Sequence, residues 1–204
     1  MAQPVPGGVA ARDARSVAVE LEAPLAINRW RPLYAWILAI PHWVVLYVVQ
    51  IIASVCMLIA VFSILFTKRI PPGVHDWIVR SYRYTWQTYS LAGFMREEYP
   101  QWGSQGGDVD PGLDPARVTI KYADELNRWS VLYKWILAIP HYFVLTFLFL
   151  GAYFAGIVAF FAVLFTGSWP AGLRDYILGV FRWYVRVQTY ILLRDDQYPP
   201  FALD

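Results

Sequence analysis

Two long apolar runs dominate the chain, and each is followed by a segment in which polar and apolar residues recur with a helical period. No charged residue occurs from Leu33 to Phe66 or from Trp135 to Thr166. A straight helix of that length would be about 50 Å long, whereas the hydrocarbon core of a bilayer is roughly 30 Å thick. Pro41 and Pro140 occupy the same place in the two runs, and proline disfavours helical geometry. We therefore predict a break there, with a short interfacial piece followed by a spanning helix of about 25 residues.

A second helix is predicted after each run, and its polar residues form a narrow stripe. A Pro-x-Gly turn at 71–73 or 170–172 precedes the helix, which ends near Met95 or Leu193. At 100° per residue the polar side chains fall within an arc of about 80°. Because the rest of the surface is apolar, we expect an embedded helix whose polar line faces protein or lipid headgroups. The stripe comprises Asp76, Arg80, Arg83, Gln87 and Ser90, and then Asp175, Gly179, Arg182, Arg186 and Thr189.

The two runs belong to an internal repeat. Residues 28–100 align without gaps on residues 127–199 at a constant offset of 99, so that NRWRPLYAWILAIPHWVVL matches NRWSVLYKWILAIPHYFVL. Upstream of each unit, at 17–21 and 118–122, apolar residues occupy every second position, which is typical of a strand with one covered face. We expect these two strands to pair.

The repeat divides the chain into four parts. We predict a flexible N-terminus (1–15), a first membrane repeat (16–100), a flexible linker rich in Gly, Asp and Pro (101–116), and a second membrane repeat (117–204). The predicted fold class is an all-α integral membrane protein. Each unit comprises a short strand, a spanning helix broken at proline and an amphipathic second helix. If the second helix of each unit also spans, the protein has four embedded helices that cross. If the second helix lies at the interface, the protein has two spans.

Composition supports a membrane location. The chain is 58% hydrophobic and 16% charged, whereas a soluble domain needs roughly 25% charged residues to cover its surface. The net charge of +2 is too small to indicate nucleic-acid binding. Most basic residues lie outside the apolar pairs, and fewer lie in the loops within each unit, namely Lys68, Arg69 and Arg174. The positive-inside rule therefore predicts a multi-pass protein with both termini in the cytoplasm.

Several motifs resemble those of a known family. They are the WILAIPH segment, the apolar run ending in LFTG, the Pro-x-Gly turn, the Arg-rich aromatic helix at 173–193 and the closing QYPPFALD. The family consists of small membrane proteins, found mainly in actinobacteria and related bacteria, and is catalogued only as a domain of unknown function. The resemblance covers nearly the whole chain and implies a bacterial integral membrane protein, but no activity. The first unit departs from the pattern, because Lys68-Arg69 replaces Gly167-Ser168.

Two histidines, His42 and His141, follow the repeated prolines. Imidazoles from facing helices would ligate a haem or a metal, or relay protons. The alternative is that each ring makes a hydrogen bond at a helix start exposed by the proline. We favour the alternative, because the sequence places no third ligand beside them, and we predict no metal and no cofactor.

The charged side chains of the stripe are the stronger candidates for a binding site. A charge at membrane depth costs several kcal/mol unless it is paired or reaches the surface. One interpretation pairs Asp with Arg along the helix and extends the guanidinium groups to phosphate headgroups. The other is a specific site for an anionic lipid or substrate. We favour the first; the lipid or anion contact candidates are Asp76, Arg80, Arg83, Asp175, Arg182 and Arg186.

The sequence carries none of the common catalytic signatures, such as a Gly-rich phosphate loop or His-Glu-x-x-His. We therefore expect a non-enzymatic protein of the bacterial inner membrane, an accessory or scaffold subunit that binds membrane lipids or a partner membrane protein. The second hypothesis is a small transporter or channel with the Arg/Asp stripes lining a path between the repeats. The third is a haem-binding redox subunit.

Overall fold

The computed structural model describes residues 17–122, 126–192 and 198–203, so the predicted flexible N-terminus lies outside the described residues. Each repeat contributes one strand, one long helix and one shorter helix, as the pattern predicted. The elements in chain order are β1 (Val17–Leu21), α1 (Arg31–Thr67), α2 (Pro72–Ala92), β2 (Ala116–Ile120), α3 (Ser130–Thr166) and α4 (Ala171–Leu192).

The predicted pairing of the two strands is confirmed, and it defines the symmetry of the molecule. β1 and β2 form an antiparallel two-stranded sheet in which Val19 lies opposite Val118. These two residues are separated by the repeat offset, so they are equivalent positions of the two units. A pseudo-twofold axis that relates antiparallel neighbours runs perpendicular to the sheet. The axis therefore passes between Val19 and Val118.

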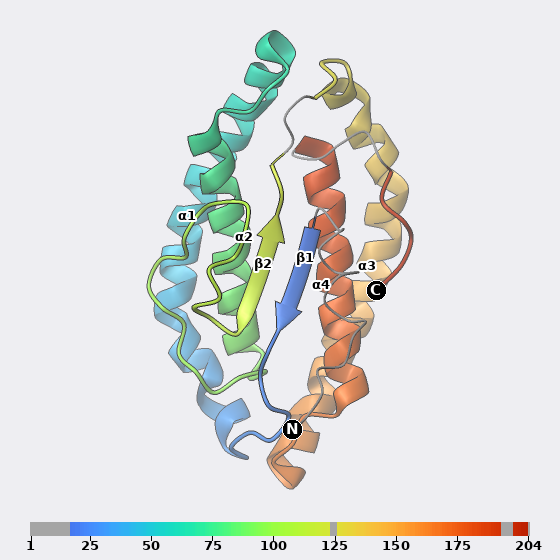
Figure 1. Ribbon diagram of the computed structural model, residues 1–204. Helices are drawn as coiled ribbons and strands as arrows, with labels where there is room; N and C mark the ends of the chain where they lie inside the picture. Colours follow the sequence, from blue (N-terminus) through green and yellow to red (C-terminus); the bar gives the residue numbers. More distant parts are fainter. Residues whose placement is uncertain (1–16, 123–125, 193–197, 204) are drawn as a thin grey trace, which may run out of the picture.

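The axis makes the two units run in opposite directions. The backbone N–H of Leu126 donates to the carbonyl of Lys68 at 2.9 Å, and that of Ile27 donates to Gly167 at 2.9 Å. The end of each long helix thus lies beside the start of the other, and Figure 1 shows α1 and α3 antiparallel. Loops within a unit and segments between units share the same ends of the molecule. The predicted orientation required these two kinds of segment to lie at opposite ends of the molecule. In the structure each end carries both kinds.

The elements are stacked along the axis. Figure 1 looks onto the sheet, with α2 and α4 behind the strands and the fainter, more distant α1 and α3 at the two sides. The inner face of the sheet, with Val19 and Val118, is buried, and so is most of α2. By contrast, only 22% of the residues in the most apolar 18-residue stretch of α1 are buried, and only 17% in that of α3. By length and composition, both helices are long and apolar enough to cross a membrane.

The predicted breaks at the prolines do not occur. Pro41 lies inside α1 and Pro140 inside α3, and each helix continues for 37 residues. A proline removes one backbone hydrogen bond, but the turns on either side of it can still pack. Ala39 and His42 are fully buried beside Pro41, so packing holds the helix together there. At 1.5 Å per residue each long helix measures about 55 Å.

Candidate functional site

The polar stripe of α2 faces protein. The guanidinium of Arg83 donates from Nε to the carbonyl of Val118 at 2.7 Å and from its two other nitrogens to the carbonyls of residues 105–107 at 2.6 to 3.0 Å. The carboxylate of Asp110 lies 3.1 Å from Nε, and the Arg83 side chain is 1% exposed. The Arg83 guanidinium thus binds three successive carbonyl groups of the linker, and the flexibility of the linker stays a prediction.

Neighbouring residues of the stripe hold the same linker. Asp76 accepts a hydrogen bond from the backbone N–H of Gly107 at 3.0 Å. Ser104 donates to the carbonyl of Arg80 at 2.7 Å, and the Arg80 guanidinium lies over the ring of Trp77, 4.8 Å from its centroid. In the first repeat the stripe thus serves as the surface on which the segment between the repeats packs.

In the second repeat the stripe contacts the other strand and the C-terminal segment. Arg182 Nε donates to the carbonyl of Val19 at 2.8 Å, which is the counterpart of the arginine–valine contact in the first repeat. Arg186 donates to the carbonyl of Ala202. Asp175 is exposed near the start of α4. Among the predicted anion contacts, the structure thus gives Arg83, Arg182 and Arg186 backbone acceptors, and the assignment of a lipid contact to them stays a prediction.

His42 is enclosed by aromatic side chains of its own repeat and of the start of the linker. Its Nδ1 shares a hydrogen bond of 2.8 Å with the hydroxyl of Tyr84 on α2. Its ring stacks on Trp102 with 4.5 Å between centroids, and Tyr99 meets it edge-on at 4.7 Å. Nε2 is buried and has no hydrogen-bond partner among the described residues.

His141 has the equivalent surroundings in the second repeat. Trp183 donates from Nε1 to its Nδ1 at 3.1 Å, and the ring stacks on Phe201 at 4.0 Å. The structure therefore does not bring the two histidines face to face. Each makes its hydrogen bond with a side chain of the second helix and not at a helix start. The described residues contain no cluster of three or more His, Cys, Asp or Glu that would hold a metal ion.

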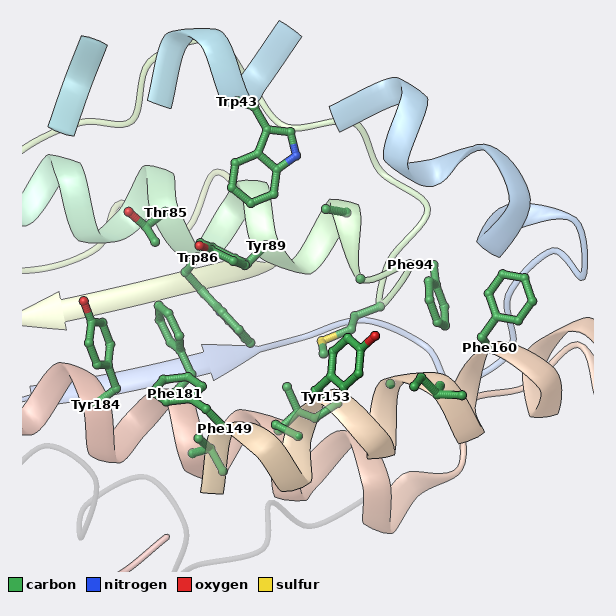
Figure 2. Close-up of a pocket in the computed structure, with 18 of the residues that line it drawn as sticks. Trp43, Thr85, Trp86, Tyr89, Phe94, Phe149, Tyr153, Phe160, Phe181 and Tyr184 are labelled. Atoms are coloured by element: carbon green, nitrogen blue, oxygen red, sulfur yellow. The ribbon is translucent and has the colours of Figure 1, made fainter. Parts of the chain in front are cut away.

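A large apolar cleft lies between the repeats. Its volume is about 1330 Å³, and residues of all four helices line it, none of them charged. Figure 2 shows the aromatic side chains that surround it, including Tyr89, Tyr153 and Tyr184. Trp86 and Phe181 stack on each other at 4.5 Å across the junction of the repeats. Sites for small molecules usually measure roughly 300 to 1,000 Å³, so this space is large for such a site.

The cleft lies off the pseudo-twofold axis. Along the long helices it is lined by residues 43–50 of α1 and residues 149–161 of α3, which are not equivalent stretches of the repeat. At this end Trp169 donates from Nε1 to the carbonyl of Phe94 at 2.8 Å, and the two rings stack at 5.2 Å. Sequence reasoning missed the cleft, because its lining is assembled from four helices and no single helix carries a distinguishing pattern.

Sequence reasoning also missed a buried ion pair after α2. Arg96 donates to the carboxylate of Asp114 and, from Nη2, to the carbonyl of Gln87 at 3.1 Å. Asp114 also accepts from the backbone N–H of Ala116 at 2.8 Å, where β2 begins. Burial lowers the pKa of Arg96 and raises the pKa of Asp114, and each charge opposes the shift of the other. The ion pair of Arg96 and Asp114 thus holds the end of the linker against α2.

Fold and site together define a duplicated helical-hairpin protein with two long apolar helices, a central two-stranded sheet and an apolar cleft between its halves. The chain belongs to the family described as Domain of unknown function (DUF4389), which matches it twice, at residues 31–102 and 128–202. The two matches confirm both the family resemblance and the tandem duplication. No curated protein and no solved structure matches the chain.

Proposed function

We propose that this is a non-enzymatic accessory protein of the bacterial inner membrane that is embedded through α1 and α3 and binds lipid in the cleft between its repeats. The exposed surfaces of both long helices support the membrane location. Val44 and Phe62 on α1 and Phe143 and Phe154 on α3 are each more than half exposed. Exposed apolar surface of this extent is stable only against another apolar phase.

The cleft is the observation that carries the lipid assignment. The cleft of about 1330 Å³ is partly open and lined by apolar side chains, so an apolar occupant is expected to cover this surface. In a membrane the surrounding matter is hydrocarbon, and the lining offers it aliphatic and aromatic contacts. Gln50 donates to Thr85 at 2.9 Å within the lining, so these two polar side chains satisfy each other. An acyl or isoprenoid chain fits this chemistry better than a polar solute does.

The other hypotheses have less support. A carrier would use the Arg/Asp stripes to line a path between the repeats, but Arg83 and Arg182 donate to the strands and the cleft lining is uncharged. A haem bound between His42 and His141 would need the two rings to face a common space, whereas His42 stacks on Trp102 and His141 stacks on Phe201. A partner membrane protein against α1 and α3 remains the second candidate for the exposed surface.

A space-filling variant tests the lipid assignment. Gly156 lines the cleft, and a Cβ added there meets nothing within 4 Å, so Gly156→Phe is expected to fill the space without a backbone clash. The matched control is Val158→Phe, two residues along α3 at a side chain that is 57% exposed. Protein extracted in gentle detergent is analysed by native mass spectrometry and lipid extraction.

We expect Gly156→Phe to lower the lipid bound per protein about tenfold, equivalent to roughly 1.4 kcal/mol of binding free energy, and Val158→Phe to leave it unchanged. Equal lipid content in both variants would contradict the cleft as the site. A protein that carries neither lipid nor a partner would contradict the proposed function as a whole.

A further inference from the structure

The sheet lies level with the middle of the long helices. The axis that relates α1 to α3 also passes between Val19 and Val118, so the centre of the sheet marks the middle of the molecule along the helix direction. Polar groups are exposed at this level. Arg117, adjacent to Val118, pairs with Glu22 at 2.8 Å, and the two side chains are 31% and 61% exposed. The linker backbone that Arg83 holds packs beside the same strand.

These positions conflict with α1 and α3 crossing a bilayer along their lengths. The exposed ion pair and the irregular linker would then lie near the centre of the hydrocarbon. Irregular backbone facing lipid does not occur at that depth, and each charge there costs several kcal/mol. The helices are also about 55 Å long, far more than the roughly 30 Å needed to cross.

Instead, the surface of the molecule changes from charged to apolar along the pseudo-twofold axis. The sheet, with Arg117 and Glu22, forms one face of the molecule. Behind it lie α2 and α4, whose polar stripes contact the strands and whose other faces pack against the long helices. The long helices form the opposite side, where the exposed residues of their apolar runs are almost all hydrophobic. A protein with one charged and one apolar face matches one headgroup layer and the acyl chains beneath it.

The ends of the long helices carry charge that fits the same placement. Lys68 at the end of α1 and Arg128 before α3 line one shallow hollow. At the other end of the molecule Arg29 lies against Gly167. A helix that crosses a membrane usually has its basic residues at one end. A helix that lies in one leaflet reaches the same anionic headgroups at both ends.

From this arrangement we propose that the protein lies within the cytoplasmic leaflet, with its pseudo-twofold axis along the membrane normal, its sheet in the aqueous phase, and α1 and α3 among the acyl chains without crossing. The partner of the apolar face is the hydrocarbon of one leaflet, and anionic headgroups meet both basic ends. This inference rests on the membrane location in the proposed function, but not on the cleft being a lipid site. It replaces the multi-pass topology expected from the sequence.

Cysteine labelling tests the placement. The single cysteine, Cys56, is removed as Cys56→Ala, because alanine occupies the equivalent position 155. Single cysteines are then introduced as Arg29→Cys, Arg69→Cys, Asp108→Cys or Arg128→Cys, all at exposed positions. A membrane-impermeant maleimide is applied to intact cells and to inverted vesicles. We expect all four positions to react in inverted vesicles and none in intact cells.

Labelling of positions 29 and 69 from opposite sides would overturn the inference while leaving the proposed function intact. A chain that is absent from the membrane fraction would overturn both. A second measurement is the depth of spin labels at Ile37, Ile51 and Phe62, which are 49%, 50% and 54% exposed along α1. We expect similar depths at the three positions; a crossing helix would place position 51 up to about 20 Å deeper than position 37.

Discussion

Arg83 donates from Nε to the carbonyl oxygen of Val118 at 2.7 Å, and this contact recurs across the sheet in the second repeat. The N–H of Val118 is also directed outward, to the carboxylate of Asp110 at 3.1 Å. Both backbone groups of the central residue of β2 are thus satisfied by side chains and not by β1. The charged side chains of Arg83 and Asp110 thus cover the outer edge of β2 in this two-stranded sheet. Arg83 and Arg182 therefore contribute to the fold through their hydrogen bonds to the strands.

The first prediction concerns this arginine. Arg83→Lys retains the charge but loses the planar group that donates to several carbonyls at once. We expect the free energy of unfolding in detergent to fall by about 2 to 4 kcal/mol. The measurement is thermal or denaturant unfolding monitored by tryptophan fluorescence. Arg182→Lys, in the equivalent but less buried position, is the matched variant and should cost less.

A role of Arg83 in binding anionic lipid predicts a different result. If this side chain served chiefly as a contact for anionic lipid, Arg83→Lys would leave unfolding unchanged and would lower the amount of anionic lipid that copurifies. That outcome would show that the carbonyl contacts contribute little to stability.

The second prediction concerns the buried pair of Arg96 and Asp114. Asp114→Ala leaves the Arg96 guanidinium buried without its carboxylate. Removal of one partner of a buried ion pair typically costs about 3 to 5 kcal/mol. We expect that loss in the free energy of unfolding. The double variant Arg96→Met with Asp114→Ala removes both charges and should recover much of the stability; a double variant as unstable as the single one would contradict this account.

The third prediction concerns His42. His42→Phe preserves an aromatic ring beside Trp102 but leaves the hydroxyl of Tyr84 buried without a partner. We expect a loss of about 1 to 3 kcal/mol in the free energy of unfolding. Adding Tyr84→Phe should restore most of it, because no polar group then lacks a partner and the unpartnered Nε2 is also gone.

An absorption spectrum of the purified protein complements the His42 variants. Because each histidine ring is enclosed by other aromatic side chains, we expect no Soret band. A Soret band that disappears in His42→Phe would establish haem ligation and would contradict the packing role assigned to this residue.

Much of the local structure follows from periodicity. The alternation in 17–21 and the stripe in 72–92 predict a strand and a helix that the structure confirms, because local hydropathy reflects which face of an element is covered. The breaks at Pro41 and Pro140 were predicted wrongly, since packing on both sides outweighs one lost hydrogen bond. The contacts of the linker could not be predicted, because its Gly and Pro residues do not indicate the guanidinium that binds its carbonyls.

The sequence by itself determined the duplication, the two pairs of helices, the pairing of the strands and the apolar character of the long helices. Only the tertiary structure decided that the repeats are inverted, that the arginine stripes face the strands, and that a cleft separates the halves. The reason is physical: hydropathy along a chain shows which face of an element avoids water, but not whether that face meets lipid or another helix. The opposition of Val19 and Val118 at the centre of the sheet sets the direction of the second repeat.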